Sequence, residues 1–419
     1  MYRWRYVEIE LERKLRSSGA VLVAGAKFIG KTTTCMRFQK SFIKLDRKSA
    51  IDLARLDPES VLKGGHPRLI DEWQSVPELW DVVKRDLDDE YIFGKYLLTG
   101  SSTPVDKTDI FHNGAGRISM VRMRPMSLFE SGDSSGTVSL STLFDGGKVT
   151  TAHNDMRIER MAFLICRGGW PVSVIADEDI AIDITRNYYD GLFLFENSRN
   201  GFWRNKKPDV MRAIVRSYAR NISSEATKSR IIEDVRQNVE RSLDPKTFDD
   251  YKEALDDLFL LEDMEAWCPS IRSKTSIRSS PVRHLADPSL GAAALAVGKK
   301  DLLSDMETFG LFFEDLAVRD LRVYAAALGG EVRHYRDNTG LEVDAVIHLK
   351  DGRWGAIEIK TGGSENVEKA CASLQRLSAK LEAKSDERKA SFLMVLTAVG
   401  DSYTRADGIH VVPLSALKA

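Results

Sequence analysis

One short stretch has residue types and a spacing that suit phosphate binding: Gly25-Ala26-Lys27-Phe28-Ile29-Gly30-Lys31-Thr32-Thr33. Two glycines with four residues between them, followed by Lys-Thr, have the spacing of a phosphate-binding P-loop. The glycines allow the backbone to wrap around a phosphate with its N–H groups pointing inward. We expect Lys31 to reach the β- and γ-phosphates and Thr32 to place its hydroxyl on Mg²⁺. The stretch therefore predicts ATP and Mg²⁺ as cofactors. The alternative is an ordinary glycine-rich turn that binds no phosphate.

A pair of acidic residues, Asp71 and Glu72, follows a short apolar run about forty positions later. A carboxylate at the carboxyl end of a strand beside a P-loop is where Mg²⁺ needs a further acidic group. We expect Asp71 to orient a metal-bound water and to help hold the metal. Glu72 is expected to act as a general base on the attacking water. The alternative is that this pair only caps the helix that begins near Pro77.

Two further polar positions are candidate nucleotide contacts. The apolar run Tyr96–Leu98 is followed by several hydroxyl side chains, of which Ser101 or Ser102 is expected to sense the γ-phosphate. Arg117 precedes another expected strand. It is interpreted either as a residue that reaches the nucleotide of a neighbouring subunit or as the partner of a nearby carboxylate. The first interpretation predicts that ATP promotes self-association into a homo-oligomer.

A second group of chemically suggestive residues lies in the last third of the chain. Asp344 is inside an expected strand, where an unpaired carboxylate would be costly. Glu358 and Lys360 are two residues apart on the next strand and therefore project from the same face. Together they resemble the PD-(D/E)xK nuclease core, in which carboxylates hold a divalent metal and the lysine assists the attacking water. That resemblance implies catalytic roles for Asp344, Glu358 and Lys360, and metal ligation by Asp344, Glu358 and Glu314, with Gln375 as an additional polar contact.

The elements that must position these residues follow from the apolar pattern. Residues 1 to about 150 alternate strands with helices, which is typical of a parallel sheet covered on both faces. The C-terminal third predicts the order helix (305–326), strand (331–335), strand (341–348), strand (353–359), helix (366–383) and strand (392–397). The fold class is therefore α/β.

Composition narrows the functional classes. The chain has 419 residues, of which 43% are hydrophobic and 29% charged, as in ordinary globular proteins of several domains. Its 61 Lys and Arg against 62 Asp and Glu leave no global attraction to nucleic acid. The N-terminus lacks a signal-peptide core, and no apolar run approaches the roughly 20 residues that span a bilayer. Four isolated cysteines suit a reducing cytoplasm, so we expect a cytoplasmic protein without membrane contact.

The middle of the chain separates into two expected parts. A Gly/Ser-rich loop (133–155) leads to a helical segment (155–200) that is expected to cover the nucleotide as a lid. Residues 205 to about 295 have the pattern of a winged helix. Its presumed reading helix carries five acidic residues and disfavours major-groove binding. The wing is basic, with Arg272, Lys274, Arg278 and Arg283, and so is the stretch 204–230. These segments predict either non-specific contact with DNA or a solvated face.

Several motifs together resemble a large bacterial and archaeal family of P-loop ATPases of AAA-like type whose C-terminal domain is of unknown function. The pieces are GAKFIGKT, LIDEWQSVPELWDVVK, YLLTGSS, GAGRISMVRMRPMSLFE, RGGWP, ENSRNGFW, LADPSL, LFFEDLAVRDL, HYRDNTGLEVDAVI and AIEIKTGG, which extend over nearly the whole chain. The resemblance implies a P-loop ATPase core with a helical lid (1–204), a winged-helix domain (205–298) and a restriction-endonuclease-like domain (299–419).

The function expected from these residues is Mg²⁺-dependent ATP hydrolysis, coupled to nucleic-acid binding or cleavage by the C-terminal domain. A non-enzymatic alternative is a nucleotide-dependent switch that displays different surfaces to a partner in its ATP and ADP states, with an inactive nuclease-like domain.

Overall fold

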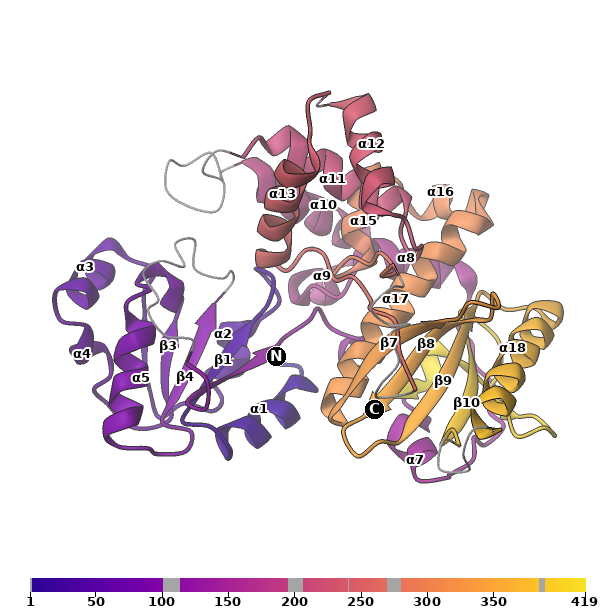
Figure 1. Cartoon of the computed structure of the whole chain (residues 1–419), viewed down its shortest axis with the longest axis horizontal. Helices are drawn as coiled ribbons and strands as arrows, with labels where there is room; N and C mark the ends of the chain where they lie inside the picture. The colour runs from indigo at the N-terminus through magenta and orange to yellow at the C-terminus, as the bar shows by residue number, and fades with distance from the viewer. Residues whose placement is uncertain (1, 101–113, 195–205, 240, 270–279, 384–388) are drawn as a thin grey trace. The chain divides into compact units, whose positions relative to one another are not determined.

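The structure of the chain is a computed structural model that describes residues 2–100, 114–194, 206–239, 241–269, 280–383 and 389–419 (Figure 1). Its contacts divide it into two compact units. The first contains the described residues up to Arg124 together with Ala254–Phe259, and the second contains the other described residues.

The first unit is built on a parallel sheet with the strand order β2-β3-β4-β1-β5. β4 therefore lies between β1 and β3 in the sheet. The strands are β1 (Ala20–Ala24), β2 (Ser41–Lys44), β3 (Arg68–Asp71), β4 (Tyr96–Gly100) and β5 (Ile118–Arg122). The helices are α1 (Val7–Leu15), α2 (Lys31–Cys35), α3 (Lys48–Leu56), α4 (Pro58–Val61), the 3-10 turn η1 (Trp73–Ser75) and α5 (Leu79–Asp89).

Both faces of this sheet are covered, as the apolar runs predict. Ala20, Ile70 and Leu98 belong to a buried core that they share with side chains of α3, α4 and α5. The alternating residues Val21 and Leu97 are also fully buried, and α1 and α2 contact the same strands. The predicted parallel sheet is confirmed, whereas α2 is only five residues long.

The second unit begins with a set of helices. They are α6 (Leu128–Ser131), α7 (Leu140–Phe144), α8 (Ile158–Arg167), α9 (Pro171–Ile175), α10 (Glu178–Leu194), α11 (Pro208–Arg220), α12 (Lys228–Asn238), α13 (Pro245–Asp257), α15 (Pro288–Leu295), α16 (Lys299–Ser304) and α17 (Met306–Ala327). The last residues of α13 are grouped with the first unit. α8 packs against α15, α16 and α17, and α11 packs against α12 and α15.

A mixed sheet with the order β11-β12-β10-β9-β8-β7 follows these helices. Its strands are β7 (Gly330–Arg336), β8 (Glu342–Leu349), β9 (Trp354–Lys360), β10 (Phe392–Thr397), β11 (Tyr403–Thr404) and β12 (His410–Pro413). α18 (Ser364–Glu382) packs on β8, β9 and β10, and α17 packs on β7, β8 and β9. The 3-10 turn η4 (Leu414–Ala416) leads to β13 (Leu417–Lys418), which pairs with β6 (Val138–Ser139). The predicted order of helices and strands in this third of the chain is confirmed.

The division at Arg124 differs from the predicted boundary at residue 204. The helices expected to form a lid, α8 to α10, are grouped with the second unit because α8 packs against α15, α16 and α17. The described part of the wing contributes only two antiparallel bridges, Leu261 to Leu285 and Met264 to Val282. The three-domain division stays a prediction. In the described residues, no helix is both long and apolar enough to cross a membrane.

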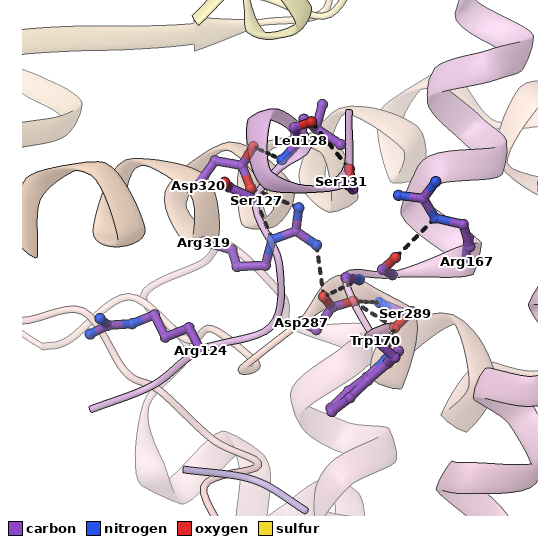
Figure 2. Close-up of polar contacts among 12 residues, drawn as sticks. Arg124, Ser127, Leu128, Ser131, Arg167, Trp170, Asp287, Ser289, Arg319 and Asp320 are labelled. Atoms are coloured by element: carbon purple, nitrogen blue, oxygen red, sulfur yellow. Dashed lines mark hydrogen bonds and ion pairs between the residues drawn. The ribbon is translucent and has the colours of Figure 1, made fainter. Parts of the chain in front are cut away.

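A buried ion network fixes α17 in the second unit, and Figure 2 shows Arg319 between two carboxylates. Arg319 Nη1 donates to Asp287 Oδ2 at 2.7 Å and its Nη2 to Asp320 Oδ1 at 2.7 Å. The backbone N–H of Leu128 donates to Asp320 Oδ2 at 2.8 Å, and that of Gly169 to Asp287 Oδ2 at 2.9 Å. The network thus ties α17 to the start of α6 and to the loop between α8 and α9.

We predict that Arg319→Leu lowers the free energy of unfolding by about 3–5 kcal/mol, because it leaves two carboxylates buried without their counter-charge. Arg333→Leu is the matched control, since the pair that Arg333 forms with Glu331 is exposed and is expected to contribute about 1 kcal/mol or less. Denaturant titration of both variants measures the difference. Equal losses for the two variants would contradict a stabilising role for this network.

Candidate functional site

The predicted P-loop joins the end of β1 to the start of α2. A Cβ on Gly25 would lie 2.3 Å from the carbonyl oxygen of Met123, so only glycine fits there. Gly30 has a φ of 92°, a left-handed conformation that glycine adopts without strain. Phe28, at the loop's exposed tip, also has a positive φ of 72°. The loop's glycines therefore stand where close backbone approach and unusual dihedrals require them.

Lys31 is buried at the base of this loop. Its ammonium donates to the carbonyl oxygens of Gly25 at 2.8 Å and Ala26 at 2.7 Å. Burial lowers the pKa of Lys31 to about 8, although the negative charges of Glu72 and Asp71 oppose that shift. Lys31 is thus held inside the loop, and its ammonium loses a proton at a lower pH than that of an exposed lysine.

Asp71 lies at the carboxyl end of β3 and accepts hydrogen bonds from two threonines. Thr32 Oγ1 donates to Asp71 Oδ1 at 2.8 Å, and Thr99 Oγ1 donates to the same oxygen. The other carboxylate oxygen, Oδ2, is buried and has no hydrogen-bond partner among the described residues. Thr32 and Asp71 together present a hydroxyl and a carboxylate oxygen, which are ligands that Mg²⁺ prefers. These two residues therefore fit the predicted metal.

Glu72 follows directly and has a left-handed backbone, with a φ of 58°. Such a conformation is uncommon for a residue with a Cβ and costs free energy. The Gln74 side chain donates to Glu72 Oε2 at 2.5 Å, which orients the carboxylate. Glu72 precedes η1 as its N-cap, but its side chain makes no capping hydrogen bond there, so its role as a general base stays a prediction.

Two contacts of this site were not predicted from the sequence. The first is Thr99, whose position follows from the register that pairs Asp71 with Thr99 across β3 and β4. The second is Arg5, which is buried and donates to the carbonyl oxygens of Ile29 at 3.0 Å and Arg124 at 2.7 Å. Thr99 could have been predicted, because it lies near the end of its strand as Asp71 does at the end of β3. No local pattern marks an arginine 24 residues before the loop segment that it supports.

The remaining predicted nucleotide contacts have different outcomes. Ser101 and Ser102 lie outside the described residues. Arg117 donates from Nε to Asp88 Oδ1 at 2.6 Å, so it has the nearby carboxylate partner of the second interpretation. The N–H of Ala20 donates to the Arg117 carbonyl at 3.0 Å, which places Arg117 at the amino end of β1. The P-loop follows the opposite end of that strand, so Arg117 does not lie beside the P-loop of its own chain.

A second cluster joins the residues predicted in the C-terminal third. Lys360 Nζ lies 2.7 Å from Glu358 Oε2 and 2.8 Å from Asp344 Oδ2. Asp344 Oδ2 also accepts from the N–H of Ile359 at 2.7 Å. Because Ala345 pairs with Ile357, Asp344 and Glu358 adjoin at the end of the paired region of β8 and β9. The predicted proximity of these three side chains is present in the structure.

The electrostatics of this cluster are dominated by carboxylates. Burial raises the pKa of Glu358 to about 8, reinforced by Asp344 and opposed by Lys360. Burial and then the charge of Asp344 raise the pKa of Glu314, on α17, well above its ordinary value. Among the described residues, no three His, Cys, Asp or Glu side chains form a group arranged to hold a metal. The Lys360 ammonium bridges Asp344 and Glu358 instead, so metal binding here stays a prediction.

Gln375, on α18, does not join this cluster. It is exposed, and its Nε2 donates to Asp407 Oδ2 at 3.1 Å. The expected extra polar contact with the cluster is therefore not seen, because Gln375 faces away from the buried side of α18.

Comparison with protein families divides the chain into three matched parts. Residues 17–131 match a family described as an AAA domain. Residues 158–301 and 309–417 each match a domain of unknown function, DUF8612 and DUF4143 respectively. The last two matches assign no activity, so the nuclease-like interpretation of the C-terminal domain is not confirmed.

Two proteins are similar in sequence to this one over most of its length. They are uncharacterized proteins of Mycobacterium bovis and Mycobacterium tuberculosis, each 24% identical over 369 residues that cover 87% of this chain and 75% of theirs. A solved structure of a Walker-type ATPase of Pyrococcus abyssi aligns with a TM-score of 0.41 and 13% identity, over 69% of this chain and 94% of that one. A structural similarity this low carries no argument about activity.

The family match and the site geometry agree on the N-terminal part. A parallel sheet, a P-loop after β1 and an acidic residue at the end of β3 coincide with the matched AAA domain. The chain therefore contains an ATP-binding domain of the P-loop ATPase class.

We predict that ATP binds more weakly as the pH rises through about 8. Phosphates raise the pKa of Lys31 above its value in the free protein, so binding above that pH must take up a proton. Calorimetry between pH 7 and 9.5 should show the dissociation constant approaching a rise of about tenfold per unit. In Lys31→Arg, whose side chain stays protonated, this dependence should disappear. An affinity independent of pH in the natural protein would contradict the assignment of Lys31.

Proposed function

We propose that the protein binds Mg²⁺-ATP at the P-loop and hydrolyses it. The observation that carries the proposal is the convergence of Thr32, Thr99 and Asp71 beside Lys31, with one buried Asp71 oxygen lacking a hydrogen-bond partner. The match of residues 17–131 to an AAA domain supports the same activity.

Each residue has a role that its position supports. The backbone of Gly25–Gly30 surrounds the phosphates, and Lys31 exchanges its two carbonyl acceptors for phosphate oxygens. Thr32 and Asp71 hold Mg²⁺, which when bound neutralises charge on the phosphates. Glu72, oriented by Gln74, accepts the proton of the attacking water. Thr99 holds Asp71 in place.

Paired variants test this proposal. Lys31→Ala should lower ATP affinity by at least about tenfold, because it removes the cation that contacts the phosphates. Glu72→Gln should keep binding but lose about 10²- to 10⁴-fold in turnover, because it keeps the size of the side chain and removes the base. Calorimetry measures binding, and phosphate release measures turnover.

Lys63→Ala, which removes an exposed lysine, is the control and should leave both measurements unchanged. Tight ATP binding by Lys31→Ala would refute the P-loop assignment. Wild-type turnover by Glu72→Gln would place the base elsewhere.

A second candidate function is metal-dependent cleavage of phosphodiesters by the C-terminal cluster. The juxtaposition of Asp344, Glu358 and Lys360 favours it, and Glu314 lies close enough for the charge of Asp344 to add to the rise in its pKa that burial causes. The carboxylates supply hard oxygen ligands that suit Mg²⁺ or Mn²⁺. Metal ligation requires the Lys360 ammonium to leave its position between Asp344 and Glu358, after which it can assist an attacking water. This candidate includes the restriction-endonuclease-like fold, a winged-helix segment at 205–298 and DNA as a partner.

We predict that Mg²⁺ without ATP raises the melting temperature by at least about 2 °C, and more at pH 8.5 than at pH 7. The pKa of Glu358 is about 8, so its carboxyl group holds a proton at pH 7 that the metal must displace. Raising the pH removes that proton and strengthens binding. Thermal unfolding should show the shift in the wild type, a smaller one in Asp344→Ala or Glu358→Ala, and an unchanged one in the control Glu365→Ala.

Lys360→Ala should keep the metal effect but lose cleavage of single- and double-stranded DNA, because an ammonium is not a metal ligand. The absence of both a metal effect and cleavage in the wild type would refute this candidate.

The non-enzymatic alternative is a nucleotide-dependent switch in a cytoplasmic protein. Slow turnover that DNA does not change would favour the switch, whereas turnover that DNA stimulates would favour nucleic-acid processing. Self-association driven by ATP stays a prediction, because the bond of Arg117 to Asp88 would have to open before Arg117 could reach a neighbouring nucleotide.

A further inference from the structure

Arg5 has no role in the proposed ATP hydrolysis, yet its side chain is buried against the P-loop, at 4% exposure. Its Nη1 donates to the carbonyl oxygen of Ile29 in the P-loop at 3.0 Å, and its Nη2 donates to that of Arg124 at 2.7 Å. All three residues belong to the first unit. Because a guanidinium is planar and presents its donors in a fixed geometry, Arg5 holds these two carbonyl groups at a set separation.

The bond to Ile29 orients one peptide group of the P-loop. The peptide between Ile29 and Gly30 is trans, so its C=O and N–H point in opposite directions. With the carbonyl directed at Arg5, the N–H of Gly30 is directed away from Arg5. A phosphate loop binds its ligand through backbone N–H groups. Arg5 therefore fixes the direction of one N–H group that the P-loop offers to a phosphate.

The second carbonyl that Arg5 holds lies where the chain leaves the first unit. Arg124 ends the N-terminal stretch of that unit, and the second unit begins at Pro125. The N–H of Met126 then donates to the carbonyl oxygen of Gly169 at 2.7 Å. The peptide groups on both sides of Pro125 are planar and its ring fixes φ, so its ψ is the one soft torsion between the two anchored groups. A displacement of the Arg124 carbonyl is therefore transmitted to Met126.

Met126 is also joined to the buried network that fixes α17. Its partner Gly169 donates its own N–H to Asp287 Oδ2 at 2.9 Å. The N–H of Leu128 donates to Asp320 Oδ2 at 2.8 Å, as Figure 2 shows. The guanidinium that holds the P-loop is thus connected, by a short segment of backbone, to the ion network of the second unit.

We propose that Arg5 is a positioning residue that couples the P-loop to the second unit. This role rests on the proposed binding of ATP. A phosphate that accepts from the Gly30 N–H immobilises the Ile29 carbonyl and, through the guanidinium, the Arg124 carbonyl. ATP binding therefore restricts the backbone of residues 126–128, and by thermodynamic linkage the same contacts strengthen ATP binding.

Hydrogen exchange of the full chain, with and without Mg²⁺-ATP, tests this coupling. At saturating ATP, the N–H groups of Met126 and Leu128 should exchange at least about fivefold more slowly in the wild type. The N–H of Leu349, which donates to the Arg353 carbonyl at 2.8 Å in the second unit, should exchange at an unchanged rate. Equal slowing at Leu349 would indicate general stabilisation of the chain and overturn the proposal.

Arg5→Lys keeps the charge but replaces the planar guanidinium with a single ammonium, which cannot hold both carbonyls in the same geometry. Calorimetry should show ATP binding weakened by about tenfold. The slowing of exchange at residues 126–128 should disappear even when ATP saturates the variant. Arg13→Lys, the same change at an exposed arginine of α1, is the matched control and should behave as the wild type does.

A purely structural role for Arg5 predicts a different result. Arg5→Lys would then melt at a lower temperature but, while folded, bind ATP and slow exchange as the wild type does, and this outcome overturns the proposal. The wild-type comparison decides the matter if the variant fails to fold. ATP binding without slower exchange at Met126 and Leu128 overturns the coupling alone. Absence of ATP binding refutes the proposed function and the coupling together, so the two failures are distinguishable.

Discussion

The nucleotide site depends on one constraint, the parallel pairing of β1, β4 and β3. Because the carboxyl ends of parallel strands meet at the same edge of the sheet, Asp71 can accept hydrogen bonds from both Thr32 and Thr99. The same arrangement places the P-loop immediately after β1 and brings Glu72 near Lys31. Any shift of β3 against β4 would separate these groups.

Much of this site could be predicted because its residues are contiguous or end neighbouring strands. The P-loop, Asp71 and Glu72 are each marked by a local pattern. In the C-terminal third, the two-residue spacing of Glu358 and Lys360 and the apolar runs around Asp344 were sufficient to predict their proximity. The helices and strands there begin and end within two residues of the prediction.

What could not be predicted depends on distant partners. Nothing local joins Arg5 to Ile29, or Arg117 to Asp88. The packing of α8 against α15 and α17 could not be predicted either, because amphipathic helices do not specify which surface they cover. Lys360 was expected to stand beside a metal, whereas its ammonium lies between the side chains of Asp344 and Glu358.

The motifs RGGWP, LADPSL and LAVRDL acquire a structural explanation in the second unit. Gly169, Asp287, Arg319 and Asp320 from these motifs form one buried network (Figure 2). A Cβ on Gly169 would lie 2.2 Å from the carbonyl oxygen of Met126, which explains the glycine. The network fixes α17, and the same helix carries Glu314 to the C-terminal cluster. These residues of the three motifs therefore serve to position a helix.

The most direct test of the central claim is the affinity for ATP measured with and without Mg²⁺, in the wild type and in Asp71→Asn. If Asp71 and Thr32 hold the metal, Mg²⁺ should tighten ATP binding in the wild type. The variant should lose that gain and keep the affinity that is independent of metal. An identical response to Mg²⁺ in the two proteins would contradict the account.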